Sequence, residues 1–296
     1  MHLSGKKQND KYHAKEKIFF EIEVISDKIS EFCNMEFTTI KIQLGESVAW
    51  VNLDRPEVRN ALNPEMIHEL TEVFEWLGSR DDIRVIVLKG NGKSFCAGAD
   101  LAYMKAMAGF SYEENVADAE RLSKLFQTIW FCNKAVITVV HGACIGGANG
   151  IVAASDIVIA ESKTKFAFSE VRLGITPATI SPFVLRKTGM TASKELMLTG
   201  RMFYPEEAQR FHLVNSVVDE DRLVEMERQY IEHFMHTSPD AVAECKNLLR
   251  VVSGFDNPYD PVFAQTSSLI ARQRVSEAGQ EGMAAFFEKR KPKWET

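Results

Sequence analysis

A glycine-rich stretch at 136–150, VITVVHGACIGGANG, constrains the fold more than any other part of the chain. The apolar, β-branched run at 136–140 predicts a short buried strand that stops at a turn, His141-Gly142. The glycines that follow lead into an apolar run at 151–154, which predicts a buried helix. The start of such a helix presents unpaired backbone N–H groups, which suit an anion or a carbonyl oxygen that becomes one. The alternative is a glycine turn that is packed only for space.

The spacing of these glycines excludes a dinucleotide site of the Rossmann type. That fingerprint reads G-x-G-x-x-G after a strand, whereas the glycines here are Gly142, Gly146, Gly147 and Gly150. Glu170 lies about where a ribose-binding acid would be expected, but without the first two glycines this spacing is a coincidence. We therefore predict no nicotinamide cofactor.

Composition limits the other classes of function. Hydrophobic content of 45% and charged content of 26% over 296 residues are ordinary for a globular protein with a sizeable core. The net charge of −6 disfavours nucleic acid as the main partner. The five cysteines form no C-x-x-C pair, which predicts a reducing, cytoplasmic location without a disulfide framework or a metal site. No apolar run approaches membrane-spanning length, so no membrane partner is expected.

Three segments of the chain differ in composition. Residues 1–34 are polar and Lys-rich and carry no signal-peptide pattern. We interpret them as an N-terminal extension, disordered or not native, before a domain that starts near Met35. Strands and helices alternate over 35–220, which predicts an α/β core. The segment 221–296 is predicted to be helical, with interruptions at Gly254, Pro258 and Pro261.

Individual elements of the core can also be placed. A helix is predicted to begin at Asn63-Pro64, because asparagine is a good N-cap and proline suits the first helical turn. A long amphipathic helix is predicted over 112–131. The predicted strands, besides the one at 136–140, are 38–44, 48–53, 84–88, 156–160, 165–168 and 213–218.

Six short motifs occur in the order typical of one enzyme family. They are 54–56 with 59–62, 95–100, 141–142 with 146–147, 153–156, 168–174 and 286–290. Together they resemble the crotonase superfamily of enoyl-CoA hydratases and isomerases. The resemblance implies an α/β fold, a crotonase-like spiral of ββα units with a C-terminal helical trimerisation region. It also implies a homotrimer or dimer of trimers, and a coenzyme A thioester as the substrate without a separate cofactor.

The resemblance assigns an oxyanion hole to the backbone N–H groups of Ala97 and Gly147. Removing an α-proton from a thioester, or adding water across its conjugated double bond, places negative charge on the thioester oxygen. Two preorganised donors stabilise that charge, each by about 3–4 kcal/mol in other oxyanion holes. Small residues such as Gly98, Ala99 and Gly146 would let the thioester approach this closely. The alternative is that these small residues serve tight packing alone.

The acid/base residues depart from the two-glutamate pattern of the family's hydratases. Gly150 occupies the first carboxylate position, and Glu170 retains the second. A single carboxylate is also the arrangement of the Δ3-Δ2 enoyl-CoA isomerases, in which one base moves a proton between C2 and C4. One glutamate suffices for hydration if water lies between it and C3. Both reactions therefore remain open.

The run 169–183 resembles the bacterial methylglutaconyl-CoA hydratases of leucine degradation, which also tend to have glycine at the Gly150 position. We therefore predict hydration of a branched, carboxylated 2-enoyl-CoA such as 3-methylglutaconyl-CoA. Arg172 would bind the distal carboxylate, because guanidinium binds carboxylate bidentately. The alternatives for Arg172 are a structural salt bridge or a solvent-facing position.

The remaining predicted contacts are to coenzyme A. Arg59 lies where the family contacts the nucleotide end, and Phe286 and Lys289 match tail residues that reach the adenine and phosphates. Ala61, Asp100 and Gly150 complete the predicted binding set, although Asp100 also suits a helix cap. A catalytically silent relative that binds acyl-CoA or RNA is a further alternative. The presence of Glu170 argues against a catalytically silent protein, and the acidic net charge argues against RNA as the main partner.

Overall fold

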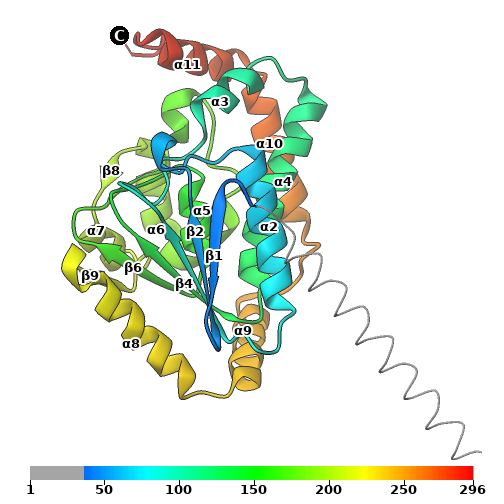
Figure 1. Cartoon of the computed structure of the whole chain (residues 1–296). Helices are drawn as coiled ribbons and strands as arrows, with labels where there is room; N and C mark the ends of the chain where they lie inside the picture. The colour runs from blue at the N-terminus through cyan, green and yellow to red at the C-terminus, as the bar shows by residue number, and fades with distance from the viewer. Residues whose placement is uncertain (1–36, 296) are drawn as a thin grey trace, which may run out of the picture. The chain divides into compact units, whose positions relative to one another are not determined.

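The computed structural model describes residues 37–295 of the chain. Its largest sheet has six strands in the order β1-β2-β3-β4-β6-β9 (Figure 1). These strands are β1 (Ile40–Leu44), β2 (Val48–Leu53), β3 (Val85–Gly90), β4 (Ala135–Val140), β6 (Ile157–Glu161) and β9 (Ser216–Val218). Within this sheet of the described residues, only β1 and β2 pair antiparallel, and the pairs from β2 to β9 are parallel. The strands predicted from the sequence are confirmed, with small shifts at their ends.

The inner strands are buried because their residues are almost all apolar. β4 is buried along its whole length, which is typical of a parallel strand covered on both faces. On one face, Val87, Ile137 and neighbouring residues pack against helix α8 (Leu223–Met235). The other helices of the core are α2 (Pro64–Gly78), α3 (Leu101–Met107), α4 (Tyr112–Phe131), α5 (Ala148–Ala154), α6 (Ser181–Thr199) and α7 (Pro205–Arg210).

The predicted helix that begins at Asn63-Pro64 and the predicted helix over 112–131 are confirmed as α2 and α4. The side chain of Asn63 accepts a hydrogen bond from Met66 N at the start of α2, and Ser111 and Glu114 form a capping box at the start of α4. α4 packs between α2 and α10 (Pro261–Arg274), and the three helices run side by side in Figure 1. This layer forms one wall of the candidate site.

A second sheet was only partly predicted. It contains β5 (Ala143–Ile145), β7 (Lys165–Ala167) and β8 (Met202–Phe203), with β5 and β7 parallel. The expectation that the chain turns from Gly142 directly into a helix is therefore incomplete, because β5 lies between them. An isolated bridge joins Cys144 of β5 to Cys96. It places the glycine turn that follows β5 beside the small-residue turn at 95–100.

The C-terminal part is helical, as predicted for 221–290. It contains α8, α9 (Pro239–Ser253), α10 and α11 (Glu277–Glu288), with Gly254 and Pro261 at two of the helix boundaries. The break at Ser238-Pro239 was not predicted, although serine as N-cap before proline is the same signal that marks α2.

Short 3₁₀ helices connect several elements: η1 (Pro56–Val58), η2 (Ser169–Leu173) and η3 (Glu220–Arg222). No helix within 37–295 is long and apolar enough to cross a membrane. The proposed extension 1–34 lies outside the described residues, and the boundary near residue 220 stays a prediction.

Candidate active site

A cavity of about 520 Å³ is lined both by the α/β core and by helices α10 and α11. Most of its lining is apolar, including Leu62, Met104, Met107, Leu122, Ile180 and Ile270. Its charged or phenolic lining residues are Tyr103, Asp118, Glu170, Arg172 and Arg274. An apolar cavity with a few polar groups suits a small-molecule site.

The backbone donor that the turn at 95–100 offers to this cavity is not the predicted one. Ala97 N donates to Arg59 O at 3.0 Å, so this N–H group is already used and the assignment of Ala97 to the oxyanion hole is wrong. Leu62 instead bonds the residues on either side of Ala99, donating to Gly98 O at 2.7 Å and accepting from Asp100 N at 2.9 Å. In a parallel bridge of this kind, the N–H of Ala99 points away from Leu62. It donates no hydrogen bond within residues 37–295.

The glycine turn after β5 supplies a second free donor. Gly146 has φ +54° and donates to Ala167 O at 2.9 Å, which fixes the turn on β7. Gly147 is the N-cap of α5, and its N–H has no hydrogen-bond acceptor among the described residues. A β-carbon on Gly98, which has φ +99°, would lie 3.0 Å from Ile145 O. The two turns therefore approach through small residues, and both Ala99 and Gly147 line the cavity.

Glu170 lies beside the second turn, in η2. A β-carbon on Gly146 would lie 3.3 Å from Glu170 Oε1, so this carboxylate sits against the glycine turn. The other oxygen, Oε2, is buried and has no hydrogen-bond partner in the part of the chain that the structure describes. Burial raises the pKa of Glu170 to about 7, against a small lowering by its own backbone N–H. A carboxyl group with a pKa near neutrality can exchange protons with a substrate.

Gly150 does not line the cavity, which corrects its predicted place in the binding site. It is buried in α5, and a β-carbon there would lie 2.5 Å from Phe126 Cζ and 2.6 Å from Ile180 Cγ2. These two side chains occupy the space that a carboxylate at this position would need. The described part of the chain thus offers Glu170 without a second glutamate at this turn.

Two arginines line the cavity, and they differ in whether their charge is paired within the described residues. Arg172 is exposed, as the solvent-facing alternative expects, and no ion pair or side-chain hydrogen bond joins it to another residue within 37–295. Arg274 Nη1 donates to Asp118 Oδ2 at 2.7 Å, and Tyr103 donates its hydroxyl to Asp118 Oδ1. The positive charge of Arg274 is thus compensated, whereas that of Arg172 is free. Sequence reasoning missed the cluster of Tyr103, Asp118 and Arg274, because its members come from α3, α4 and α10 and no local spacing links them.

The sequence profile of the enoyl-CoA hydratase/isomerase family matches residues 43–296. The chain belongs to the enoyl-CoA hydratase/isomerase family. The short-chain-enoyl-CoA hydratase of Clostridium acetobutylicum is 31% identical over 87% of this chain and 97% of its own length. The (E)-benzylidenesuccinyl-CoA hydratase of Thauera aromatica is 31% identical over 86% of this chain and 97% of its own.

Solved structures of this enoyl-CoA hydratase/isomerase family share the fold. An enoyl-CoA hydratase from Shewanella pealeana superposes with a TM-score of 0.73 at 38% identity, covering 89% of this chain and 98% of that one. The crotonase fold predicted from the six motifs is therefore confirmed. The predicted trimerisation through the C-terminal helices stays a prediction.

The other residues predicted to contact coenzyme A fall into two groups, according to whether they line the cavity. Phe286 on α11 lines the cavity and is 47% exposed. Arg59 and Lys289 are exposed but do not line the cavity, and Ala61 is buried and does not line it either. Their contact with coenzyme A stays a prediction.

Asp100 has a structural role. It caps α3 by accepting from Ala102 N at 2.9 Å and Tyr103 N at 3.2 Å, and it pairs with Arg55 at 2.8 Å. Burial raises the pKa of Asp100, but the bonds from Arg55 and the backbone outweigh this and lower it. Asp100 is therefore a helix cap and does not line the cavity.

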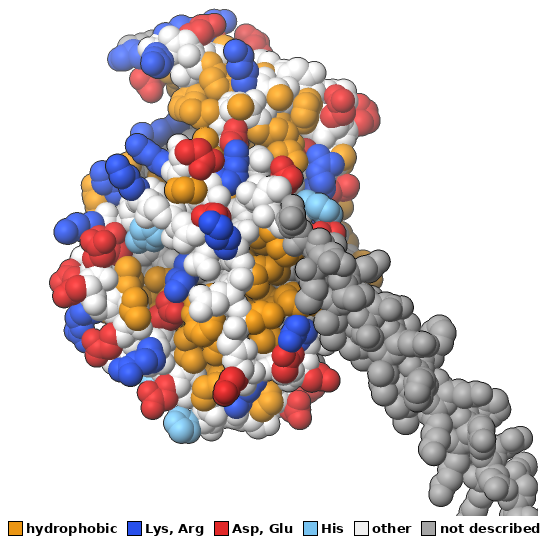
Figure 2. Space-filling model, in the orientation of Figure 1, with side chains coloured by type: hydrophobic (Ala, Val, Ile, Leu, Met, Phe, Trp, Pro, Cys, Tyr) orange, Lys and Arg blue, Asp and Glu red, His pale blue; other side chains and the backbone are white. Residues whose placement is uncertain are grey.

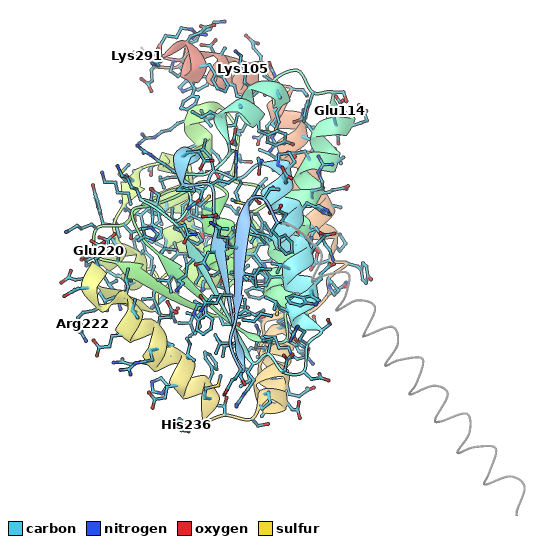
Figure 3. The ribbon with its side chains drawn as sticks, in the orientation of Figure 1. Lys105, Glu114, Glu220, Arg222, His236 and Lys291 are labelled. Carbon is cyan, nitrogen blue, oxygen red and sulfur yellow. The ribbon has the colours of Figure 1, made fainter. Side chains whose placement is uncertain are left out.

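One end of the fold is rich in exposed basic side chains. In Figure 3, Lys105 of α3 and Lys291, which follows α11, lie at the same end of the molecule. Gln280 Nε2 of α11 also donates to Ala108 O, just after α3, at 3.3 Å. Both helices contribute cavity residues. Figure 2, in the same orientation, shows acidic and basic side chains interspersed over this side of the molecule, with apolar areas between them.

Proposed function

We propose that the protein hydrates a 2-enoyl-CoA to a 3-hydroxyacyl-CoA. The observation that supports this most is Glu170, a buried carboxylate with one unpartnered oxygen and a pKa raised to about 7. It lies against a turn with a free N–H donor, in an apolar cavity. An acyl-CoA thioester fits this arrangement, as it fits the family to which the chain belongs.

In the proposed mechanism, the thioester oxygen accepts hydrogen bonds from the N–H groups of Ala99 and Gly147. Ionised Glu170 removes a proton from a water molecule as that water attacks C3, and the electrons of the double bond move onto the thioester oxygen. The two donors stabilise this enolate where its charge develops. Glu170 then returns a proton to C2, so that water has added across C2 and C3 and the enzyme is regenerated.

The alternative reaction is double-bond isomerisation. It is favoured by the packing at Gly150, which leaves a single glutamate at the turn, since one base is enough to carry a proton between C4 and C2. The products distinguish the two reactions. Incubation with crotonyl-CoA should give 3-hydroxybutyryl-CoA, whereas an isomerase would leave crotonyl-CoA without added water and would convert a 3-enoyl-CoA instead. A catalytically silent relative would turn over neither.

For the acyl group, we propose a branched chain with a distal carboxylate, with 3-methylglutaconyl-CoA as the specific substrate. Arg172 supports this because it lines the cavity and its guanidinium has no partner among residues 37–295, whereas Arg274 is occupied by Asp118. A relative named for benzylidenesuccinyl-CoA is consistent with a carboxylated acyl chain in this family. A cytoplasmic homotrimer or dimer of trimers remains part of the proposal.

A further inference from the structure

One buried amide connects the two parts of the proposed active site. The side chain of Asn149, in α5, is fully buried. Its Nδ2 lies 3.2 Å from Cys144 O, 3.2 Å from Gly146 O and 3.0 Å from Ala167 O. These carbonyls belong to β5, to the glycine turn and to the end of β7. Ala167 O also accepts from Gly146 N at 2.9 Å, so this carbonyl joins the turn to β7 twice.

The carbonyl oxygens around the side chain of Asn149 favour a hydrogen-bond donor at this position. Three carbonyl oxygens converge on one NH₂ group. Two of them also accept a backbone N–H, Ala167 O from Gly146 N and Gly146 O from Asn149 N, each at 2.9 Å. An acceptor or an apolar group at this position would remove the donor that the three carbonyls share. The other end of the amide, Oδ1, accepts from the thiol of Cys144 at 3.4 Å, so the amide has one orientation that satisfies both ends.

We infer that Asn149 is a positioning residue that holds the oxyanion donor of Gly147 at a fixed separation from Glu170. Gly147 directly follows Gly146, and Glu170 lies three residues after Ala167. The amide of Asn149 bonds Gly146, which lines the cavity, and Ala167, but Asn149 is not itself part of the cavity lining. This inference rests on the proposed function, because it takes Gly147 and Glu170 as the reacting groups.

Substitution of Asn149 should therefore impair chemistry more than substrate binding. In Asn149→Ala, β5, the turn and β7 lose their common donor, and misplacement of catalytic groups by about 1 Å costs on the order of 10²-fold. We expect kcat with crotonyl-CoA to fall about 10- to 100-fold, with KM changed less than threefold. Asn149→Ser keeps one hydrogen-bond donor and should recover part of the kcat that Asn149→Ala loses. If Asn149→Ala does not fold, Asn149→Ser is compared with wild type in its place.

A matched control separates positioning from general stability. Asn115 is equally buried and donates to Phe110 O at 3.2 Å and Ser111 O at 3.0 Å, but it lies in α4, outside the turn. Asn115→Ala should lower the Tm, as Asn149→Ala does, while kcat stays near wild type. The second readout is the ultraviolet band of the enolate that forms when acetoacetyl-CoA binds to two N–H donors. This band should weaken in Asn149→Ala and remain in Asn115→Ala.

The outcomes distinguish this inference from the proposed function. A wild-type protein without hydratase turnover contradicts the proposed function, yet the enolate band still reports on the donors that Asn149 positions. An active wild type whose kcat and enolate band are unchanged in Asn149→Ala contradicts the inference, and Asn149 is then a core amide only. Equal losses of kcat in the Asn149 and Asn115 variants contradict it as well.

Discussion

The carboxyl group of Glu170 is largely removed from bulk solvent. Burial raises its pKa from an ordinary 4.5 to about 7. The proposed base is the ionised form, so activity should rise with pH and level off above pH 7. At pH 5 only about one molecule in a hundred would carry the ionised base. A pH profile of kcat/KM between pH 5 and 9 checks this, and a profile that is flat from pH 5 to 7 would show an unshifted carboxyl group.

Arg172 offers the free guanidinium for a substrate carboxylate. Arg172→Met should lower kcat/KM for 3-methylglutaconyl-CoA on the order of 10- to 100-fold, equivalent to about 1.5–3 kcal/mol for a charge-assisted hydrogen bond. The same change should leave crotonyl-CoA almost unaffected, because that substrate has no distal carboxylate. Arg222→Met, at an exposed arginine of η3 labelled in Figure 3, is the control. Equal losses on both substrates would exclude the carboxylate role.

At the scale of elements, helix α5 is packed too closely for a second glutamate. Gly150→Glu would force its β-carbon into Phe126 and Ile180. We expect a loss of stability of about 1–3 kcal/mol or more, the range for overpacked cores, and no gain in hydratase activity. Thermal unfolding and crotonyl-CoA kinetics measure the two effects. A stable variant with higher turnover would mean that the position accepts the family's first carboxylate after all.

The elements show which parts of the fold local sequence signals determine. α2 and α4 were predictable because each has a cap and several turns of apolar periodicity, and β4 because its residues are uniformly apolar. β5 was missed because three residues between glycines are too few to show a strand period. Its pairing with β7 depends on residues more than twenty positions later.

The residues of the candidate active site also divide into those that a local sequence signal predicts and those that it does not. Glu170 and Gly147 were predicted because the motifs that contain them are continuous in sequence. Ala97 was assigned in place of Ala99 because the direction of an N–H group depends on its bridge partner, here Leu62, which is distant in sequence. The cluster of Tyr103, Asp118 and Arg274 has no local signal, since Asp118 and Arg274 are 156 positions apart.

At the scale of the whole molecule, α9 leaves an apolar stripe uncovered in the single chain. Leu248, Leu249 and Val252 lie on one face of the helix and are 59%, 63% and 77% exposed. Large exposed apolar side chains that cluster often mark an interface between proteins. We expect the protein to elute with three or six times the 33.4 kDa mass of one chain. Light scattering after size exclusion measures this.

A paired substitution tests whether this stripe is the interface. Leu249→Glu with Val252→Glu should dissociate the oligomer, because charges would replace apolar contacts between copies. Glu244→Gln, an exposed change on the same helix, is the control and should leave the mass unchanged. A wild-type protein that is monomeric at micromolar concentration would contradict the predicted trimer.

The central claim is that Glu170 alone carries out acid/base chemistry in the cavity. The most direct test compares wild type with Glu170→Gln on crotonyl-CoA and identifies the product by mass spectrometry. The glutamine keeps the shape of the side chain but cannot transfer the proton, so turnover should fall about 10²- to 10⁴-fold while thioester binding persists. Wild type should form 3-hydroxybutyryl-CoA. Wild-type turnover that is unchanged by Glu170→Gln would contradict the account.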